Sequence, residues 1–171
     1  NHENYDKAEE QHRKALSIRQ NIKDRYGEGR SLNNLGNIML SRGELDKAEE
    51  LYRESLPIRK EVGDQRGYGA VLNNLGLIAD RRGDPDEAER LFRESIAIDR
   101  EIGDTRRMAN MSRALSSAAL GRGDDADAER LLNESLSLSR KIEDKRNISN
   151  CLWNLSKLVW NRGDLDTAVW M

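Results

Sequence analysis

The sequence has little of several residues on which common kinds of protein depend. Cys151 is its single cysteine, so no internal disulfide can form, and this mildly favours a reducing compartment. Its two histidines, His2 and His12, are ten residues apart and near no cysteine, which makes a metal site improbable. Aromatic residues make up 5% of the 171 residues and hydrophobic residues 36%, so one thick globular core is hard to build.

Features that direct a chain to a membrane or to nucleic acid are also missing. No run of apolar residues approaches the roughly 20 that span a bilayer, and no signal-peptide pattern is present. The formal net charge is -2 with 35% charged residues, so no broad field attracts nucleic acid or an anionic membrane. We therefore expect a cytoplasmic protein that binds neither.

No arrangement of side chains indicates catalysis. The segment from Gly27 to Gly36, GEGRSLNNLG, lacks the strand and the spacing of a phosphate-binding loop. Carboxylates are many but periodic, which suits solvated helix faces and i,i+4 ion pairs such as Glu49 with Arg53. We expect no enzyme activity, no cofactor and no metal ion.

A repeat of 40 residues is the main feature that the sequence does have. The stretch from Ser31 to Leu56, SLNNLGNIMLSRGELDKAEELYRESL, returns from Val71 to Ile96 as VLNNLGLIADRRGDPDEAERLFRESI. Three sets of identical residues keep the 40-residue step: Gly43, Gly83, Gly123 and Gly163; Ala8, Ala48, Ala88, Ala128 and Ala168; Leu35, Leu75, Leu115 and Leu155. Such a period indicates stacked repeats, and each layer of a stack buries its apolar side on its neighbours alone.

Helical spacing divides each unit into two helices joined by a turn. Residues 25–62, 65–102 and 105–142 are predicted to be full units. Residues 4–22 would be the second helix of an incomplete unit, with a buried stripe of Ala8, Ala15, Leu16, Ile18 and Ile22. Residues 145–171 would be a further partial unit. Because both ends fall inside units, we expect a single array cut from a longer protein.

Glycines mark the predicted turns and joints. Gly43 and its repeats lie where the first helix of a unit must end, since glycine accepts the left-handed backbone that closes a helix. Gly63 and Gly103 play the same part between units. Lys23 and Glu143 take the place of glycine at the other two joints, so we expect those joints to be strained or differently shaped.

These motifs resemble the tetratricopeptide repeat, over essentially all 171 residues. That family carries a Leu-Gly pair in its first helix, then Ala, a large apolar residue and a small residue in its second. The corresponding residues here are Leu35-Gly36, Ala48, Tyr52 and Ser55; Leu75-Gly76, Ala88, Phe92 and Ser95; Leu115-Ser116, Ala128, Leu132 and Ser135; Leu155-Ser156 and Ala168. The period is 40 rather than the common 34, as in kinesin light chains, Pins-type proteins and prokaryotic signalling arrays. The resemblance implies an all-α, right-handed α-solenoid of antiparallel helix pairs.

The resemblance also implies which surface binds ligands. At about 100° per residue, Leu32, Leu35, Gly36 and Met39 face the second helix of the same unit, and Gly36 allows close approach. The opposite side of each first helix lines the concave groove of such arrays. The residues expected there are Arg30, Asn33, Asn34 and Asn37; Asn73, Asn74, Leu77 and Arg81; Asn110 and Arg113; Asn150, Trp153, Asn154, Lys157 and Trp160.

Asparagine has both a donor and an acceptor, so it can pair with the amides of an extended peptide. We favour ligand contact for Asn33, Asn37 and Asn73, while Asn34, Asn74 and Asn154 can equally bond neighbouring helices and fix the register. The cations on this face, Arg30, Arg113 and Lys157, suit acidic side chains or a terminal carboxylate.

Trp153 and Trp160 are seven residues apart, hence on one side of a helix. They are either binding anchors or packing residues beneath a following repeat.

The expected function is a protein-interaction scaffold that binds a peptide or a partner domain in its groove. One alternative is the sensor or autoinhibitory region of a larger signalling ATPase or transcription regulator. Another is an array that self-assembles by stacking its open ends.

Overall fold

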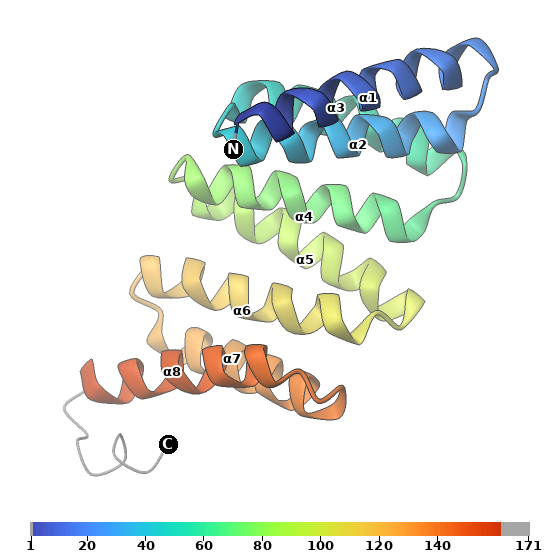
Figure 1. Cartoon of the computed structure of the whole chain (residues 1–171). Helices are drawn as coiled ribbons and strands as arrows, with labels where there is room; N and C mark the ends of the chain where they lie inside the picture. Colours follow the sequence, from blue (N-terminus) through green and yellow to red (C-terminus); the bar gives the residue numbers. More distant parts are fainter. Residues whose placement is uncertain (1, 162–171) are drawn as a thin grey trace. The chain divides into compact units, whose positions relative to one another are not determined.

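The chain is entirely α-helical over residues 2–161, the part that this computed structural model describes. Helices follow one another with short turns and no strand in that range (Figure 1). They are α1 (His2–Asn21), α2 (Arg25–Arg42), α3 (Leu45–Glu61), α4 (Gln65–Arg81), α5 (Pro85–Ile102), α6 (Thr105–Gly121), α7 (Asp125–Lys141) and α8 (Lys145–Asn161). The prediction of an all-α helical repeat solenoid is confirmed. Gly163 and Ala168 of the predicted last unit lie outside the described residues.

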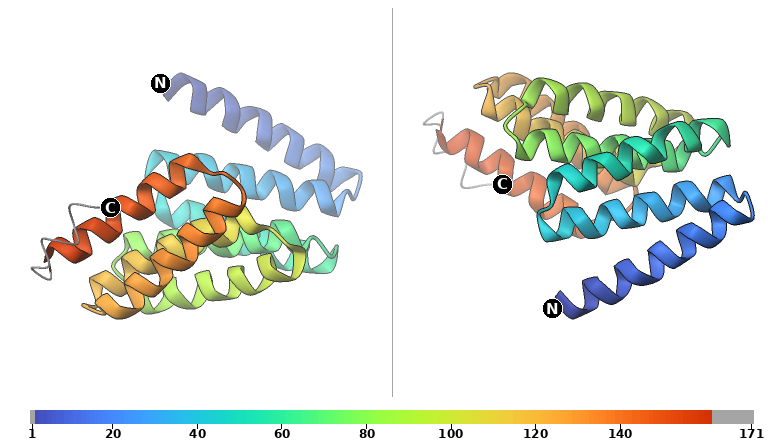
Figure 2. Two further views of the ribbon diagram at one scale, coloured as in Figure 1. Left: turned by 90° about the horizontal axis from the view of Figure 1, so that it is seen from below. Right: turned by 90° about the horizontal axis from the view of Figure 1, so that it is seen from above.

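The chain divides into two compact units, each larger than one 40-residue repeat. The first unit is Asn1–Arg82 with α1 to α4, and the second unit is Gly83–Met171 with α5 to α8. In the first unit α2 packs against α1, α3 and α4, and α3 also packs against α4. In the second unit α6 packs against α5, α7 and α8, and α7 also packs against α8. Figure 2 shows from two further sides that α1 lies beside α2 and α7 beside α8. The boundary between the units falls inside the predicted repeat of residues 65–102.

Local signals explain where the helices begin. An aspartate precedes most of them, and its side chain accepts a hydrogen bond of 2.9–3.1 Å from the backbone N–H three residues further on. This satisfies one of the free donors at a helix start. The capping residues are Asp24, Asp64, Asp84, Asp104, Asp124 and Asp144.

A residue with left-handed backbone recurs every 20 residues between the described helices. The glycines at 43, 63, 83, 103 and 123 have φ between 71° and 79°. Lys23 and Glu143 have the same backbone shape without being glycine, with φ of 57° and 54°. This conformation costs a residue with a β-carbon roughly 1–2 kcal/mol. The joints at Lys23 and Glu143 were expected to be either strained or differently shaped. They are strained, because they have the same backbone shape as the glycine joints.

Glu143→Gly is expected to raise the free energy of unfolding by roughly 0.5–1 kcal/mol, because relief of the left-handed strain exceeds the entropy that glycine adds to the unfolded chain. Urea unfolding followed by circular dichroism measures this change. Gly103→Ala, in the same unit and register with φ of 73° and open space around an added β-carbon, should lower stability by a similar amount. A less stable Glu143→Gly chain would contradict the assignment of strain.

The apolar core lies where the repeat pattern predicts it. Leu32, Leu35 and Met39 on the inner side of α2 are at most 1% exposed, and Ala48 of α3 is fully buried. Gly36 permits the predicted close approach, because a β-carbon there would lie 2.6 Å from Cε1 of the Tyr52 ring. The predicted buried stripe of residues 4–22 is wrong: Ile18 and Ile22 are 59% and 68% exposed, and Ala8, Ala15 and Leu16 are only half-buried.

The helix partner of α1 explains this error. Ile58, the equivalent of Ile18 in α3, is buried and would touch a β-carbon at Gly29 of α2. It is therefore packed against the first helix of its own unit. Among residues 2–161 no equivalent helix lies against Ile18, whose side chain is exposed. A periodic pattern identifies the apolar face but not the element that covers it.

A pair of matched residues lies where the second helix of each 40-residue repeat meets the first helix of the next, and the chemistry of this pair changes along the chain. The paired positions are eight residues apart: Arg19 and Gly27, Arg59 and Gly67, Asp99 and Arg107, Ser139 and Asn147. We call these the joint pairs.

The first two joint pairs combine a long arginine with a glycine. Arg59 is buried, forms an ion pair with Asp64 and donates to the carbonyl of Gly29. A β-carbon at Gly67 would overlap its guanidinium. Arg19 similarly donates to the carbonyl of Gly27 over 3.1 Å. The small residue therefore provides the space that the arginine fills.

The other two joint pairs, both in the second unit, use different chemistry. Asp99 of α5 is fully buried and forms an ion pair with Arg107 of α6. Ser139 and Asn147 are uncharged, and Nδ2 of Asn147 donates to Oγ of Ser139 over 2.7 Å. One position in the repeat thus carries arginine, aspartate or serine, each with a partner that suits it.

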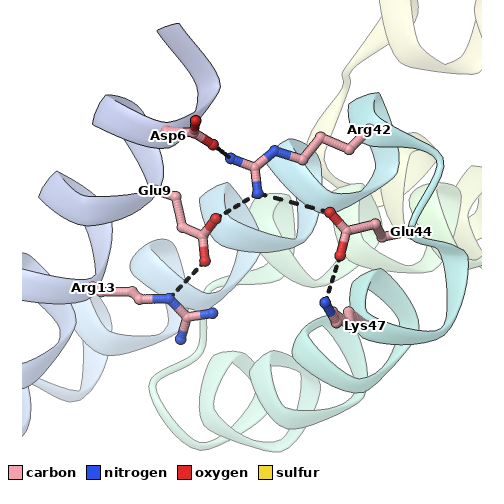
Figure 3. A network of polar contacts seen from close by, with 6 residues as sticks. All are labelled: Asp6, Glu9, Arg13, Arg42, Glu44 and Lys47. Carbon is pink, nitrogen blue, oxygen red and sulfur yellow. Dashed lines mark hydrogen bonds and ion pairs between the residues drawn. The ribbon is translucent and has the colours of Figure 1, made fainter. Parts of the chain in front are cut away.

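Ion pairs between successive helices also recur with the repeat. Arg42 at the end of α2 contacts Asp6 of α1 over 2.5 Å and Glu9 over 2.6 Å (Figure 3). Arg13 and then Arg42 hold the pKa of Glu9 below its ordinary value by hydrogen bonding. The equivalent contacts join Arg82 to Asp46 and Glu49, and Arg122 to Glu89. Such links fix how one helix lies along the next.

Candidate binding site

The predicted ligand-binding residues of the first unit lie on α2 and α4, which contact each other. None of them is buried. Three are exposed and five are half-buried: Arg30, Asn37 and Arg81; Asn33, Asn34, Asn73, Asn74 and Leu77. The opposite side of both helices is in the core. The structure thus leaves this polar face accessible, and we call it the asparagine face.

Asn37 is held in one orientation by its neighbours. Its Oδ1 accepts hydrogen bonds from the hydroxyl of Tyr52 over 2.7 Å and from Nδ2 of Asn74 over 3.0 Å. Burial raises the pKa of Tyr52, so that hydroxyl stays a donor. The amide oxygen is therefore occupied, and the NH2 group of this exposed residue has no partner within residues 2–161. Asn37 presents donors to whatever lies on the asparagine face.

Asn33 and Asn73 occupy the same position in successive 40-residue repeats, and they share an unusual feature. Each side chain is half-buried, and its Oδ1 is buried without a hydrogen-bond partner among the described residues. An unpaired buried acceptor is costly and needs an explanation.

Three further residues of the asparagine face contact residues of α2. Asn74 links α4 to α2 through Asn37, and Nη1 of Arg81 lies 3.4 Å from the carbonyl oxygen of Leu40. The guanidinium of Arg30 lies 5.9 Å from the centre of the Tyr26 ring. These contacts position the side chains before any ligand binds.

The predicted residues of the second unit lie on α6 and α8, which also contact each other. Asn110, Arg113 and Asn150 line a pocket of about 380 Å³. Its other lining residues are ones that the sequence interpretation missed: Arg106, Asp144, Arg146 and Asn147. The sequence did contain a signal for two of them, because Arg106 and Arg146 are 40 residues apart and so repeat with the array. They were missed because they lie nearer the start of the helix than the residues of the family motif.

Trp153 and Trp160 are 65% and 64% exposed. They line a cavity of about 480 Å³ with Lys157, whose ammonium lies 5.3 Å from the centre of the Trp153 ring. Asn154 is half-buried beside them. Whether a following repeat covers these tryptophans stays a prediction, because residues 162–171 lie outside the described part.

Residues 2–161 hold no group of metal ligands and no membrane-spanning helix. Between residues 2 and 161, no three His, Cys, Asp or Glu side chains gather as metal ligands. No helix there is both long and apolar enough to span a bilayer. Cys151 is buried, with its Sγ 3.2 Å from Oγ of Ser135, and His12 is half-buried on α1.

The eight helices of residues 2–161 and the 40-residue period of the sequence define the class of α-helical repeat proteins. The sequence pattern of the tetratricopeptide repeat matches residues 3–61 and again residues 69–102, together more than half of the chain. The chain belongs to the tetratricopeptide repeat family. Proteins of this family typically bind proteins or peptides and act as non-enzymatic scaffolds. A comparison with curated protein sequences found no match.

Solved structures share the fold at low sequence identity. BtubC from P. vanneervenii is 20% identical with a TM-score of 0.79, over 96% of this chain and 69% of that one. Kinesin light chain TPR-like repeats of Podospora anserina are 17% identical with a TM-score of 0.74, over 96% of this chain and 82% of that one. A STAND ATPase of Pyrococcus horikoshii, with a tetratricopeptide repeat sensor, is 19% identical with a TM-score of 0.81, over 96% of this chain and 26% of that one.

Proposed function

We propose that this chain is a protein-interaction module whose asparagine face binds an extended peptide segment of a partner protein. The observation that carries the proposal is the fixed orientation of Asn37. Its amide oxygen is held by Tyr52 and Asn74, so its unpaired N–H groups are turned outward. A surface that presents fixed donors is suited to backbone carbonyls.

The asparagine face offers both halves of what a peptide backbone needs. An extended peptide presents alternating C=O and N–H groups, and these supply affinity that does not depend on side chains. Asn37 donates to a carbonyl. Asn33 and Asn73 have Oδ1 atoms without partners, and these would accept from a peptide N–H once the half-buried side chains rotate toward the ligand. Arg30 at one end of the face and Arg81 at the other suit acidic side chains of the ligand.

The two alternatives use surfaces of the same chain. A sensor role would place a segment of a larger protein on the asparagine face, as an intramolecular ligand. Self-assembly would join the ends of the array instead. Likeness to the STAND sensor at 19% identity concerns the fold alone, and no contact within residues 2–161 favours either alternative over a peptide from a partner.

Asn37→Asp is expected to weaken peptide binding by about tenfold or more, because it replaces the outward donors by an acceptor that repels a carbonyl. The substitution keeps an oxygen for Tyr52 and Asn74, so folding should be retained. Peptides are first selected on the whole chain from a random displayed library. Their affinities for wild type and variant are then measured by calorimetry.

Asn133→Asp is the matched control, since Asn133 is an exposed asparagine on α7 and the charge change is the same. It should leave the affinity unchanged. If selected peptides bind the Asn37→Asp chain as tightly as the wild type, the asparagine face is not the binding surface.

A further inference from the structure

We propose that the pocket between α6 and α8 binds a phosphate monoester. The pocket has a volume of about 380 Å³ and lies wholly within the second unit. Its lining residues come from both helices and the turn before α8: Arg106, Asn110, Arg113, Asp144, Arg146, Asn147 and Asn150. The pocket shares no residue with the asparagine face, and the inference does not depend on the peptide proposal.

The lining carries an excess of positive charge. It holds three guanidinium groups and one carboxylate, in a chain whose formal net charge is -2. That carboxylate is already engaged, because Asp144 accepts from Nη1 of Arg106 over 3.0 Å and from the backbone N–H of Asn147 over 3.1 Å. Two positive charges are left to be matched by a ligand.

Two of the arginines have donors to spare. Arg113 is held by one hydrogen bond of 2.9 Å from its Nε to Oδ1 of Asn147, which is uncharged. This fixes the side chain and leaves the terminal N–H groups of its guanidinium. Arg146 is exposed and has no ion pair or hydrogen bond with the residues that the structure describes. Guanidinium groups bind phosphate oxygens in pairs of parallel hydrogen bonds.

A phosphate monoester matches this lining better than a carboxylate. It carries a charge of about -1.5 to -2 and three acceptor oxygens, whereas a carboxylate has a single charge and two oxygens. The amides of Asn110 and Asn150 supply additional donors at the same pocket. Both the charge and the number of donors therefore favour a dianion.

The repeat itself does not require this arrangement. Arg113 corresponds to Asn33, Asn73 and Trp153 in the other 40-residue repeats. A first helix of this array therefore packs well with asparagine in place of Arg113. The bond to Asn147 uses only Nε of Arg113, so the terminal N–H groups of its guanidinium have no part in the stacking, and a ligand can take them.

The test is a titration of the whole chain with inorganic phosphate, O-phosphoserine and succinate at constant ionic strength, followed by NMR and calorimetry. We expect saturable binding of the two phosphates, with chemical shift changes at residues of α6 and α8. Arg113→Asn, which copies Asn33 and Asn73, should weaken it about tenfold, as expected when a charged hydrogen bond is lost. Arg146→Gln should weaken it comparably and removes no internal bond, so it serves even if Arg113→Asn folds poorly.

Arg130→Asn is the control, because Arg130 is an exposed arginine on α7 that pairs with Asp127. It should leave phosphate binding unchanged. Tighter binding of O-phosphoserine than of inorganic phosphate would identify a phosphorylated protein as the source of the group, and equal binding would identify a small phosphate compound.

Three results would overturn the proposal: no saturable binding of either phosphate, succinate binding as tightly as phosphate, or Arg130→Asn weakening binding as much as Arg113→Asn. The Asn37→Asp variant should still bind phosphate, so failure here is distinguishable from failure of the peptide proposal.

Discussion

Replacing Arg107 by asparagine is expected to lower the free energy of unfolding by about 3–5 kcal/mol, the cost of removing one partner of a buried ion pair. Asp99 is fully buried in α5, and the guanidinium of Arg107 in α6 neutralises it. Without that guanidinium the carboxylate stays buried and loses the opposite charge that pairs with it, and an unpaired buried charge is costly. Urea unfolding of the whole chain, followed by circular dichroism, measures the loss.

The chain offers its own control for this prediction. Asp99→Ser together with Arg107→Asn reproduces the joint pair of Ser139 and Asn147, which are hydrogen-bonded over 2.7 Å. Replacing both members of a buried ion pair by neutral groups is far less costly than removing one. The double variant should therefore be more stable than Arg107→Asn by at least about 2 kcal/mol. Equal stability of the two variants would show that the pair does not act as a unit.

Gly36→Ser is expected to lower the free energy of unfolding by about 2–3 kcal/mol through overpacking. A β-carbon at this position lies 2.6 Å from Cε1 of Tyr52 and 2.8 Å from Cδ1. That ring has little freedom to move, because Tyr52 is fully buried and its hydroxyl is bonded to Asn37. The gain in helix propensity, roughly 0.5 kcal/mol, offsets only part of the cost. Thermal and urea unfolding give the measurement.

A second substitution should relieve this strain. At the equivalent place in the second unit, Ser116 and Leu132 are both buried, so a serine is accommodated where the partner is smaller than tyrosine. Gly36→Ser combined with Tyr52→Leu is expected to be more stable than Gly36→Ser alone, despite the loss of the tyrosine hydrogen bond. If Gly36→Ser by itself is neutral, α2 and α3 do not approach as closely as described.

Much of the fold follows from local signals in the sequence. Apolar residues at helical spacing, aspartates before helices and glycines after them all act within about one turn of helix. They are repeated every 40 residues, so an error in one unit is corrected by the others. This is why the helix positions and the inner side with Leu32, Leu35 and Met39 could be predicted.

The chemistry of the candidate sites depended on longer-range contacts. Asn37 was chosen from its place on a helix, but which of its atoms face outward is decided by Tyr52, 15 residues away, and Asn74, 37 residues away. Arg106 and Arg146 form one pocket only because α6 and α8 pack side by side. The change from arginine to aspartate to serine at the joint pairs gives no periodic signal at all.

The sequence by itself therefore determined the repeat, the helices and the face that each helix buries. Only the tertiary structure decided which side chains of different helices meet, which donors remain for a ligand, and where positive charge gathers. The physical reason is range: hydrogen bonds and apolar contacts within a helix join residues at most about four apart. Contacts between helices depend on how whole elements dock.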